Sequence, residues 1–301
     1  MIVFNRNIFF SDEPKLNTDI KNGSLETIFV SEKPLGGELD VLTLETEWIP
    51  MSGQQGRYRS STPFRNEGTF SWALEIKDIL TLFWHSNTRE IFYLKESGYT
   101  PERLRFWVLH TFLPLVLELE QTYSILHVGS VEVYGKPILF SAFSFGGKST
   151  LTDYFLKQGH PLLSDDSLGI QRREDGYYAI PSYPFHRPYR QLETLGYFIE
   201  NFEAKPKPLH AIFSLEKRDA DADIKITEIS GIEKFKALHY SSFVNFDFMK
   251  KKRFDFFMEM AKYIPAYKIE IPWDTQRLPE VYSAIITHIT ATKAHHIAPR
   301  G

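Results

Sequence analysis

Residues His127 to Leu168 read HVGSVEVYGKPILFSAFSFGGKSTLTDYFLKQGHPLLSDDSL. An apolar segment leads into a glycine-rich turn, a helical pattern, and a second apolar segment that ends in two aspartates. The turn contains Gly146-Gly147-Lys148-Ser149-Thr150, the second half of the phosphate-loop pattern G-x-x-x-x-G-K-[ST]. Such a turn between a strand and a helix predicts a phosphate site, because backbone N–H groups and the positive helix N-terminus both attract anions.

The motif carries a lysine and a hydroxyl with defined chemistry. In such loops the lysine, here Lys148, reaches the β- and γ-phosphates of a nucleotide, and the next hydroxyl, Ser149, ligates Mg²⁺. Two positions depart from the pattern, since Ala142 replaces the first glycine and Phe145 stands where small residues are common. Alanine fits there only with a negative φ, so we expect a slightly altered turn. The alternative is a glycine-rich turn that matches by chance.

Two adjacent carboxylates, Asp165 and Asp166, follow one crossover after the loop. A phosphoryl transferase needs one carboxylate for its metal ion and another to accept the proton of the attacking hydroxyl. Neighbouring side chains on an extended segment point in opposite directions, so one aspartate can face the nucleophile and the other the metal. The alternative is a solvated turn or a helix cap. The motif before the acids favours the catalytic interpretation.

A wider set of residues surrounds the loop in a fixed order: His127, Tyr134-Gly135, Lys148, Gly159-His160 and Asp165-Asp166. The separations are 21 residues from His127 to Lys148 (148 − 127) and 17 from Lys148 to Asp165 (165 − 148). In order and separation this set resembles the HPr kinase/phosphorylase family, which has a strand histidine, a Tyr-Gly turn, a P-loop, a Gly-His pair and an Asp pair.

The resemblance implies an α/β fold, with a P-loop kinase domain of the HPr kinase and phosphoenolpyruvate carboxykinase type, and ATP and Mg²⁺ as cofactors. Carried over by position, Asp165 would be the general base toward an acceptor hydroxyl, and His127 would lie near it. Asp166 and Ser149 would hold the metal. The nucleotide phosphates would lie against the loop residues Ser144, Phe145, Gly146, Gly147, Lys148, Ser149 and Thr150.

Two differences from the family narrow the expected substrate. Thr150 stands where HPr kinase/phosphorylases have an acidic residue, and Tyr183–Arg190 (YPFHRPYR) replaces their E-[LI]-R-G-[LI]-G segment. The layout is similar to HPr-kinase-like proteins of peptide-modification gene clusters, which phosphorylate a serine of a small precursor peptide. In the replaced segment, Arg187 is a candidate to neutralise charge on the transferred phosphoryl group. The alternative is a surface loop with scattered basic residues.

The chain before this stretch has another pattern. Residues 1–97 hold short alternating or aromatic segments between polar turns, which predicts a β-rich N-terminal module. Thr100-Pro101-Glu102 then begins an apolar pattern at three- and four-residue spacing. This pattern predicts a helix to about Gln121 that Pro114 kinks or splits. We place the catalytic domain at residues 98–301.

Two local predictions concern turns. Met51–Gly56 is expected to be a turn or a loop because of its glycine and serine content. Tyr123–Val133 and Pro137–Phe140 are expected to be the two strands of a hairpin, joined by a tight turn at Tyr134-Gly135-Lys136.

Composition excludes several function classes. The net charge of −3 gives no general attraction to nucleic acid or to anionic lipid. The absence of cysteine excludes disulfides, thiolate zinc sites and a cysteine nucleophile, and it fits a reducing compartment. No apolar run approaches the roughly 18–20 residues of a membrane span, so we expect a cytoplasmic protein without a membrane or nucleic-acid partner.

These observations predict a kinase that transfers the γ-phosphoryl group of ATP to a hydroxyl, with serine of a protein or small peptide as the expected acceptor. One alternative is a nucleotide-binding regulator with weak or no transfer, which Ala142 and Phe145 motivate. Another is a kinase of a small-molecule alcohol. Members of the family that the chain resembles are often oligomeric, so a homo-oligomer is an expectation of the resemblance.

Overall fold

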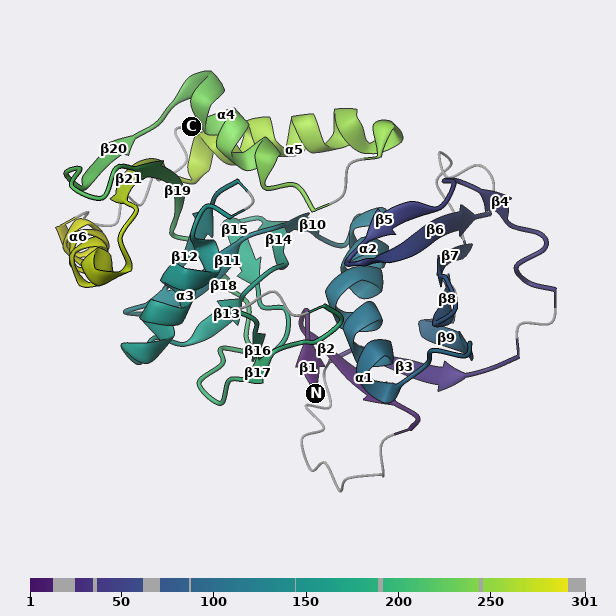
Figure 1. Ribbon diagram of the computed structural model, residues 1–301. Helices are drawn as coiled ribbons and strands as arrows, with labels where there is room; N and C mark the ends of the chain where they lie inside the picture. The colour runs from purple at the N-terminus through teal and green to yellow at the C-terminus, as the bar shows by residue number, and fades with distance from the viewer. Residues whose placement is uncertain are drawn as a thin grey trace. The chain divides into compact units, whose positions relative to one another are not determined.

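A computed structural model of the chain describes residues 1–12, 25–34, 37–61, 71–86, 88–143, 145–188, 192–243 and 246–291. It divides into two compact units, Met1–Tyr123 with Tyr189–Gly196, and Ser124–Pro188 with Tyr197–Gly301 (Figure 1). The first unit therefore extends past the boundary at residue 97, because the helical segment after that boundary belongs to it. Within the described ranges, no helix is both long and apolar enough to cross a membrane.

The first unit is built on a nine-stranded sheet in the order β1-β2-β3-β9-β8-β7-β6-β4, with β5 paired to β6. Its strands are β1 (Ile2–Val3), β2 (Arg6–Phe10), β3 (Thr27–Glu32), β4 (Thr43–Leu44), β5 (Ile49–Met51), β6 (Gln54–Ser60), β7 (Ser71–Ile76), β8 (Leu80–His85) and β9 (Glu90–Lys95). The turn predicted within Met51–Gly56 is present but shorter than the predicted range. Ser52 and Gly53, with φ of 47° and 84°, form it, and strands β5 and β6 flank it on both sides.

After β9 the first unit continues with a helical segment of three parts. These are α1 (Pro101–Phe106), η1 (Trp107–Phe112) and α2 (Leu113–Leu119). The hydroxyl of Thr100 caps its start by accepting the N–H of Arg103 at 3.2 Å. The middle part is a π-helix in which the N–H of Leu113 bonds the carbonyl of Val108. Pro114 removes one helical N–H and crowds the preceding turn, and the wider π turn accommodates it. The predicted disturbance at Pro114 thus takes the form of a π segment within a continuous helix.

The second unit has a six-stranded sheet in the order β13-β11-β12-β19-β21-β20. Its strands are β11 (Gly129–Val133), β12 (Lys136–Ser141), β13 (Leu162–Ser164), β19 (Ala211–Arg218), β20 (Lys225–Glu228) and β21 (Ala266–Pro272). Strands β12, β19 and β21 are parallel, and β11 runs antiparallel to both β12 and β13. Strands β12, β13, β19 and β21 therefore all end at the same edge of the sheet, which we call the carboxyl edge.

A second sheet in this unit has the order β10-β14-β15-β18. Its strands are β10 (Ser124–Leu126), β14 (Leu168–Arg173), β15 (Gly176–Ile180) and β18 (Lys207–Pro208), and a separate pair joins β16 (Phe185–His186) to β17 (Tyr197–Phe198). The predicted hairpin is confirmed for β11 and β12, which pair around the turn at Tyr134-Gly135. Its first strand is shorter than the predicted Tyr123–Val133, because β10 and β11 belong to different sheets. The chain crosses between them at His127, whose N–H bonds the carbonyl of Ser241 at 2.6 Å.

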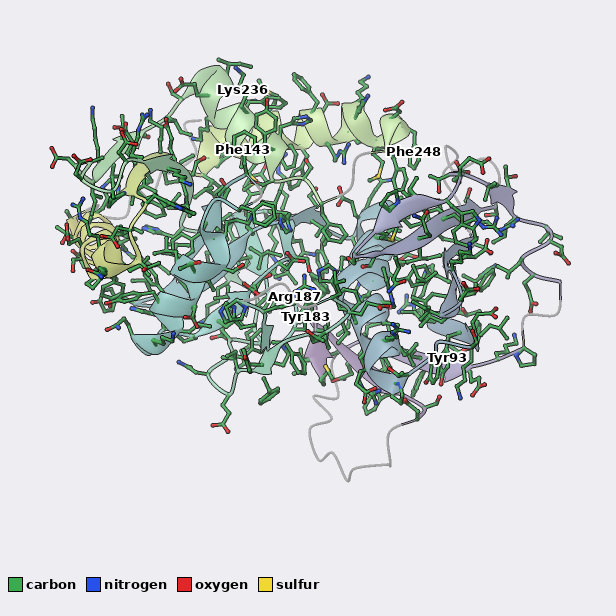
Figure 2. All side chains as sticks on the ribbon, viewed as in Figure 1. Tyr93, Phe143, Tyr183, Arg187, Lys236 and Phe248 are labelled. Atoms are coloured by element: carbon green, nitrogen blue, oxygen red, sulfur yellow. The ribbon has the colours of Figure 1, made fainter. Side chains whose placement is uncertain are left out.

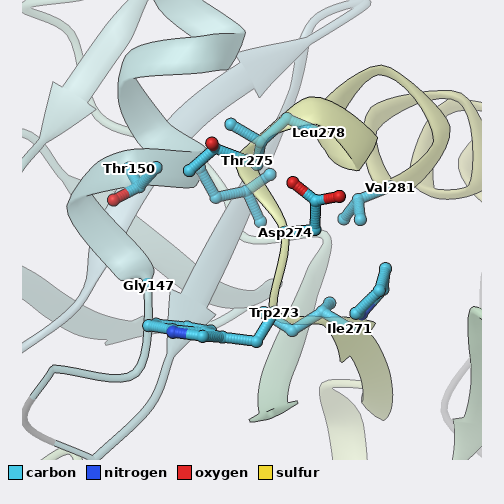
Figure 3. A pocket seen from close by; sticks show the side chains of 10 residues that line it. Gly147, Thr150, Ile271, Trp273, Asp274, Thr275, Leu278 and Val281 are labelled. Carbon is cyan, nitrogen blue, oxygen red and sulfur yellow. The ribbon is translucent and has the colours of Figure 1, made fainter. Parts of the chain in front are cut away.

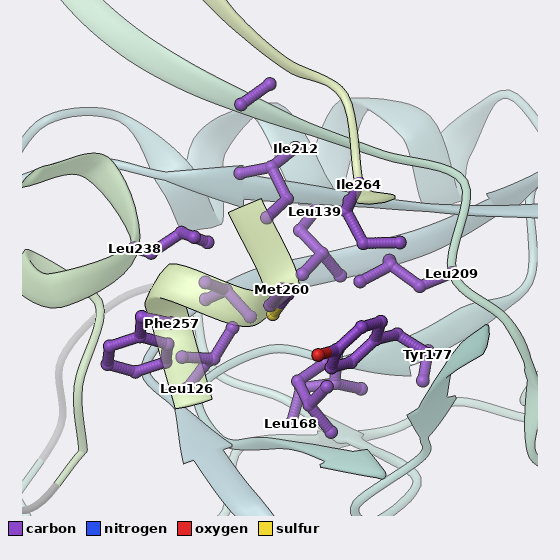
Figure 4. Close-up of a cluster of buried hydrophobic side chains, with 14 of the residues drawn as sticks. Leu126, Leu139, Leu168, Tyr177, Leu209, Ile212, Leu238, Phe257, Met260 and Ile264 are labelled. Atoms are coloured by element: carbon purple, nitrogen blue, oxygen red, sulfur yellow. The ribbon is translucent and has the colours of Figure 1, made fainter. Parts of the chain in front are cut away.

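Helices cover both faces of the six-stranded sheet (Figure 1). On one face, α3 (Lys148–Lys157) and α6 (Leu278–Ala291) form a core with strand residues such as Phe140 and Phe213. On the other face, α4 (Gly231–Tyr240), α5 (Lys250–Tyr263) and the second sheet enclose a core that includes Leu139, Ile212 and Met260 (Figure 4). Alternate residues of β12 thus enter different cores, which gives this α/β unit three layers.

Candidate active site at the carboxyl edge

The glycine loop, residues 142–147, connects the end of β12 to the start of α3. It turns tightly, since the N–H of Gly146 donates to the carbonyl of Phe143 at 2.9 Å. A Cβ at Gly146 would lie 2.6 Å from the Cβ of Ala142 and 2.9 Å from the carbonyl oxygen of Phe143. Position 146 therefore accepts a side chain only if the loop backbone moves. Ser144, one of the expected nucleotide contacts, lies outside the described residues.

The end of the loop has left-handed backbone at two positions, Phe145 with φ of 62° and Gly147 with φ of 88°. Glycine adopts this conformation freely, whereas another residue is disfavoured by about 1–2 kcal/mol. Gly147 is the N-cap of α3, and no side chain caps this helix. Since the first N–H groups of a helix have no intrahelical acceptor, this end of α3 is suited to an anion. The residues Phe143 and Phe145 are 71% and 79% exposed.

Lys148 begins α3 and is buried. Its ammonium group donates to the carbonyl of Ala142 at 3.1 Å and so spans the glycine loop. Ser149 and Thr150 follow in the first turn, where Thr150 is exposed and Ser149 is partly buried. The lysine and the two hydroxyl residues thus lie together at the N-terminus of α3.

Asp165 lies directly after β13 and is buried. Its Oδ2 accepts the backbone N–H of Arg187 at 2.7 Å, and its Oδ1 lies 3.1 Å from Nδ1 of His186. His186 is also buried, and its Nε2 lies 3.5 Å from the carboxylate of Asp153 on α3. The histidine therefore stands between two carboxylates. The sequence showed that Tyr183–Arg190 contains basic residues, but it did not predict the two carboxylate partners of His186.

Asp166 faces away from this cluster. Its Oδ1 lies 3.0 Å from Nδ1 of His127, and the two side chains are 20% and 33% exposed. The adjacent acids thus point to different partners, as expected for an extended segment. His127 is close to Asp166, whereas the resemblance placed it near Asp165.

Tyr183 is a neighbour of the acid pair that sequence reasoning did not single out. Its side chain, which is labelled in Figure 2, is buried, and burial raises its pKa well above the ordinary value, with a further contribution from the negative charge of Asp166. The positive charge of Arg187 opposes this effect. The phenol therefore stays neutral and can donate a hydrogen bond. The only feature of the sequence that marks Tyr183 is the aromatic and proline content of the segment Tyr183–Arg190.

His160 has a structural environment. Its Nδ1 lies 3.1 Å from the carbonyl of Glu132 and its Nε2 lies 3.0 Å from the hydroxyl of Tyr282. The ring also packs against Phe155 and Tyr134. These contacts join β11, α3 and α6, and they assign His160 to the packing of the domain.

Within the described ranges, no group of three or more His, Asp or Glu side chains is arranged to hold a metal ion. Ser149 and Asp166 would thus supply only part of a shell. Mg²⁺ sites commonly combine one or two carboxylates with waters and substrate phosphates.

We compared the chain with protein families, curated proteins and solved structures. No protein-family model and no curated protein matches the chain. Among solved structures, the HPr(Ser) kinase/phosphatase from Coxiella burnetii is similar with a TM-score of 0.34 and 13% sequence identity, over 55% of this chain and 95% of that chain. A TM-score of this size leaves the function to be argued from the residues of this chain.

Proposed function

We propose that the chain is a kinase that uses ATP and Mg²⁺ and transfers the γ-phosphoryl group to a serine hydroxyl of a protein or peptide. One observation carries this proposal. The glycine loop with Lys148 follows β12, the acid pair follows β13, and both strands end at the carboxyl edge with only β11 between them. This arrangement supports the proposal, because it brings the glycine loop and the pair of carboxylates to the same edge of one sheet.

The residues have distinct roles in the proposed transfer. Lys148 and the N–H groups at the start of α3 hold the phosphates, and this is the P-loop role. Asp165 accepts the proton of the serine hydroxyl, whose oxygen attacks the γ-phosphorus while the bond to the bridging oxygen breaks and ADP leaves. Mg²⁺ on Ser149 and Asp166 would supply positive charge to the phosphate oxygens. The backbone N–H of Arg187 orients Asp165, and the buried phenol of Tyr183 lies within electrostatic reach of Asp166.

An acceptor on a polypeptide is favoured by the surface beside the loop. The exposed rings of Phe143 and Tyr240 lie 5.2 Å apart between centroids, with 71% and 62% of each residue exposed. Exposed apolar surface next to a site is typical of a partner-binding face. A small alcohol would need an enclosed pocket beside Asp165. The aromatic pair therefore favours a peptide over a small-molecule acceptor.

A second candidate is a nucleotide-binding regulator without efficient transfer. The burial of Asp165 under His186 and the backbone of Arg187 favours it, because an acceptor reaches the carboxylate only after this segment moves. The left-handed conformation of Phe145 also favours the regulator, since it constrains the loop that would have to bind the γ-phosphate.

Incubation with [γ-³²P]ATP, Mg²⁺ and a degenerate library of serine peptides tests the proposal. We expect labelled peptides with wild type, a loss of at least about 100-fold with Lys148→Ala, and no loss with Lys157→Ala. Lys157 is the matched control, because it lies on the same helix and its side chain is 69% exposed. Binding of ATP without labelling of any serine, threonine or small alcohol would favour the regulator.

A further inference from the structure

A pocket lies beside the glycine loop, on the side of α6 (Figure 3). It is open to solvent and has a cavity volume of about 160 Å³. Its wall is lined by Gly147, Thr150, Leu151, Ile271, Pro272, Trp273, Asp274, Thr275, Leu278 and Val281. The proposed function uses only the first two of these residues, so the larger part of the wall has no assigned role.

The position of the pocket links it to the phosphate site. Its floor is the segment after β21, which ends at the carboxyl edge like β12. A Cβ at Gly147 would lie 3.4 Å from Cζ3 of Trp273, so the indole reaches the N-cap of α3 (Figure 3). Ligands of open α/β sheets bind outside the carboxyl ends of parallel strands. A molecule with phosphates on α3 can therefore extend into this pocket.

Trp273 is a large aromatic side chain that is 44% exposed. The ammonium group of Lys217, which does not line the pocket, lies 4.0 Å from the ring centroid. This cation–π contact holds the indole in place from outside the pocket. An immobilised indole beside apolar Leu151 and Val281 provides a flat surface on which a planar ring can stack.

Asp274 indicates which end of a nucleotide would occupy the pocket. Its Oδ1 accepts the N–H of Gln276 at 2.9 Å, which fixes the carboxylate at the start of the short helix before α6. A carboxylate repels phosphate, whereas it accepts hydrogen bonds from N–H groups. The phosphates therefore belong at α3, and a neutral group with N–H donors belongs near Asp274.

We infer that this pocket receives the base of the nucleotide, stacked on Trp273, and so sets the affinity for nucleoside phosphates over inorganic phosphates. The inference depends on the proposed function, because it assumes that the phosphates bind at α3. It adds an adenosine-binding part to the site and names Trp273 as the residue on which that part depends.

Titration calorimetry with Mg·ADP and with Mg·pyrophosphate tests the inference on the full chain. For wild type we expect ADP to bind more tightly than pyrophosphate. Trp273→Ala should weaken ADP binding about 10- to 100-fold and leave pyrophosphate binding unchanged. Trp273→Phe should retain most of the ADP affinity, and this variant keeps the test valid if the alanine variant folds poorly.

Trp48→Ala is the matched control, since Trp48 is 36% exposed, lies 4.3 Å from the guanidinium of Arg57, and belongs to the first unit. Its ADP affinity should equal that of wild type. Equal ADP binding by wild type and Trp273→Ala, with pyrophosphate bound by both, would overturn the inference alone. Failure of both ligands to bind wild type would overturn the proposed function, and the inference with it.

Discussion

His127 and Asp166 form a pair in which Nδ1 and Oδ1 lie 3.0 Å apart, and the neighbouring Asp165 lies 3.1 Å from a different histidine, His186. The two pairs differ in access to solvent, because the side chain of Asp166 is 20% exposed and that of Asp165 only 5%. Two carboxylates that are adjacent in sequence are thus held in separate environments. This separation is consistent with the proposed roles, in which Asp165 is the base and Asp166 is a metal ligand.

The first prediction concerns Asp165→Asn. Asparagine can still accept the N–H of Arg187 at this position, but it cannot accept a proton from an acceptor hydroxyl. We expect phosphoryl transfer to fall by about 10²- to 10⁴-fold, while ADP affinity and the thermal midpoint change little. The rate of single-turnover transfer at saturating ATP measures the effect directly.

Asp153→Asn is the control for that variant, because it removes another carboxylate near His186 and lies outside the acid pair. Its transfer rate should stay within about threefold of wild type, since it removes no catalytic group. If Asp165→Asn transfers at the wild-type rate and Asp166→Asn does not, the base is Asp166 assisted by His127. The role assigned to Asp165 would then be structural.

The second prediction concerns Gly146→Ala. The added Cβ would lie 2.6 Å from the Cβ of Ala142 and 2.9 Å from the carbonyl oxygen of Phe143, so the loop must change shape. We expect binding of Mg·pyrophosphate to weaken by at least about tenfold, because the phosphate contacts depend on this shape. Titration calorimetry measures the affinity for Mg·pyrophosphate in wild type and in the variant.

Gly159→Ala separates loop shape from backbone strain. Gly159 has φ of 88°, and a Cβ there meets nothing within 4 Å. The variant should lose about 1–2 kcal/mol of unfolding free energy and keep normal pyrophosphate binding. Equal pyrophosphate affinity in wild type and Gly146→Ala would show that the tight turn has no part in holding phosphate.

The third prediction separates His160 from catalysis. Its two ring nitrogens meet the carbonyl of Glu132 and the hydroxyl of Tyr282, so His160→Ala leaves both groups without this partner. We expect a loss of about 1–3 kcal/mol in unfolding free energy, measured by urea titration. The transfer rate per folded molecule should stay unchanged. A fall in that rate at full folding would place His160 in the reaction.

The sequence predicted those parts of the site that depend on local pattern. The order strand, glycine loop, helix and strand from β12 to β13 follows from apolar runs and from glycine at Gly146 and Gly147. The opposite directions of Asp165 and Asp166 follow from the alternation of side chains on extended backbone. Each of these features involves residues within a few positions of one another.

Features that depend on tertiary contacts were not predictable in this way. His186 lies next to the carboxylates of Asp165 and Asp153. These two residues lie 21 and 33 positions before it in the sequence (186 − 165 and 186 − 153). Trp273 borders the glycine loop only because β21 and β12 lie in one sheet with β19 between them. A single strand over Tyr123–Val133 was expected because both halves are apolar, and no local signal shows that they join different sheets.

The last prediction concerns the pH dependence of stability through His210. Burial, with the positive charges of Lys136 and then His288 as smaller causes, lowers the pKa of His210 from the ordinary 6.5 to about 4. Between these two pH values the unfolded chain binds the proton and the folded chain does not, so a falling pH favours unfolding. The stabilising contribution is complete above pH 6.5 and is lost as the pH falls toward 4.

Urea titrations at pH 7 and pH 5 on wild type and His210→Gln measure this contribution. Because other groups also titrate in this range, the quantity to compare is the loss of unfolding free energy between the two pH values. We expect that loss to be smaller in His210→Gln by about 1 kcal/mol, reduced from the full shift since His210 is only partly buried. Identical losses in both proteins would mean that His210 is protonated in the folded chain at pH 5, and that its burial does not exclude the charge.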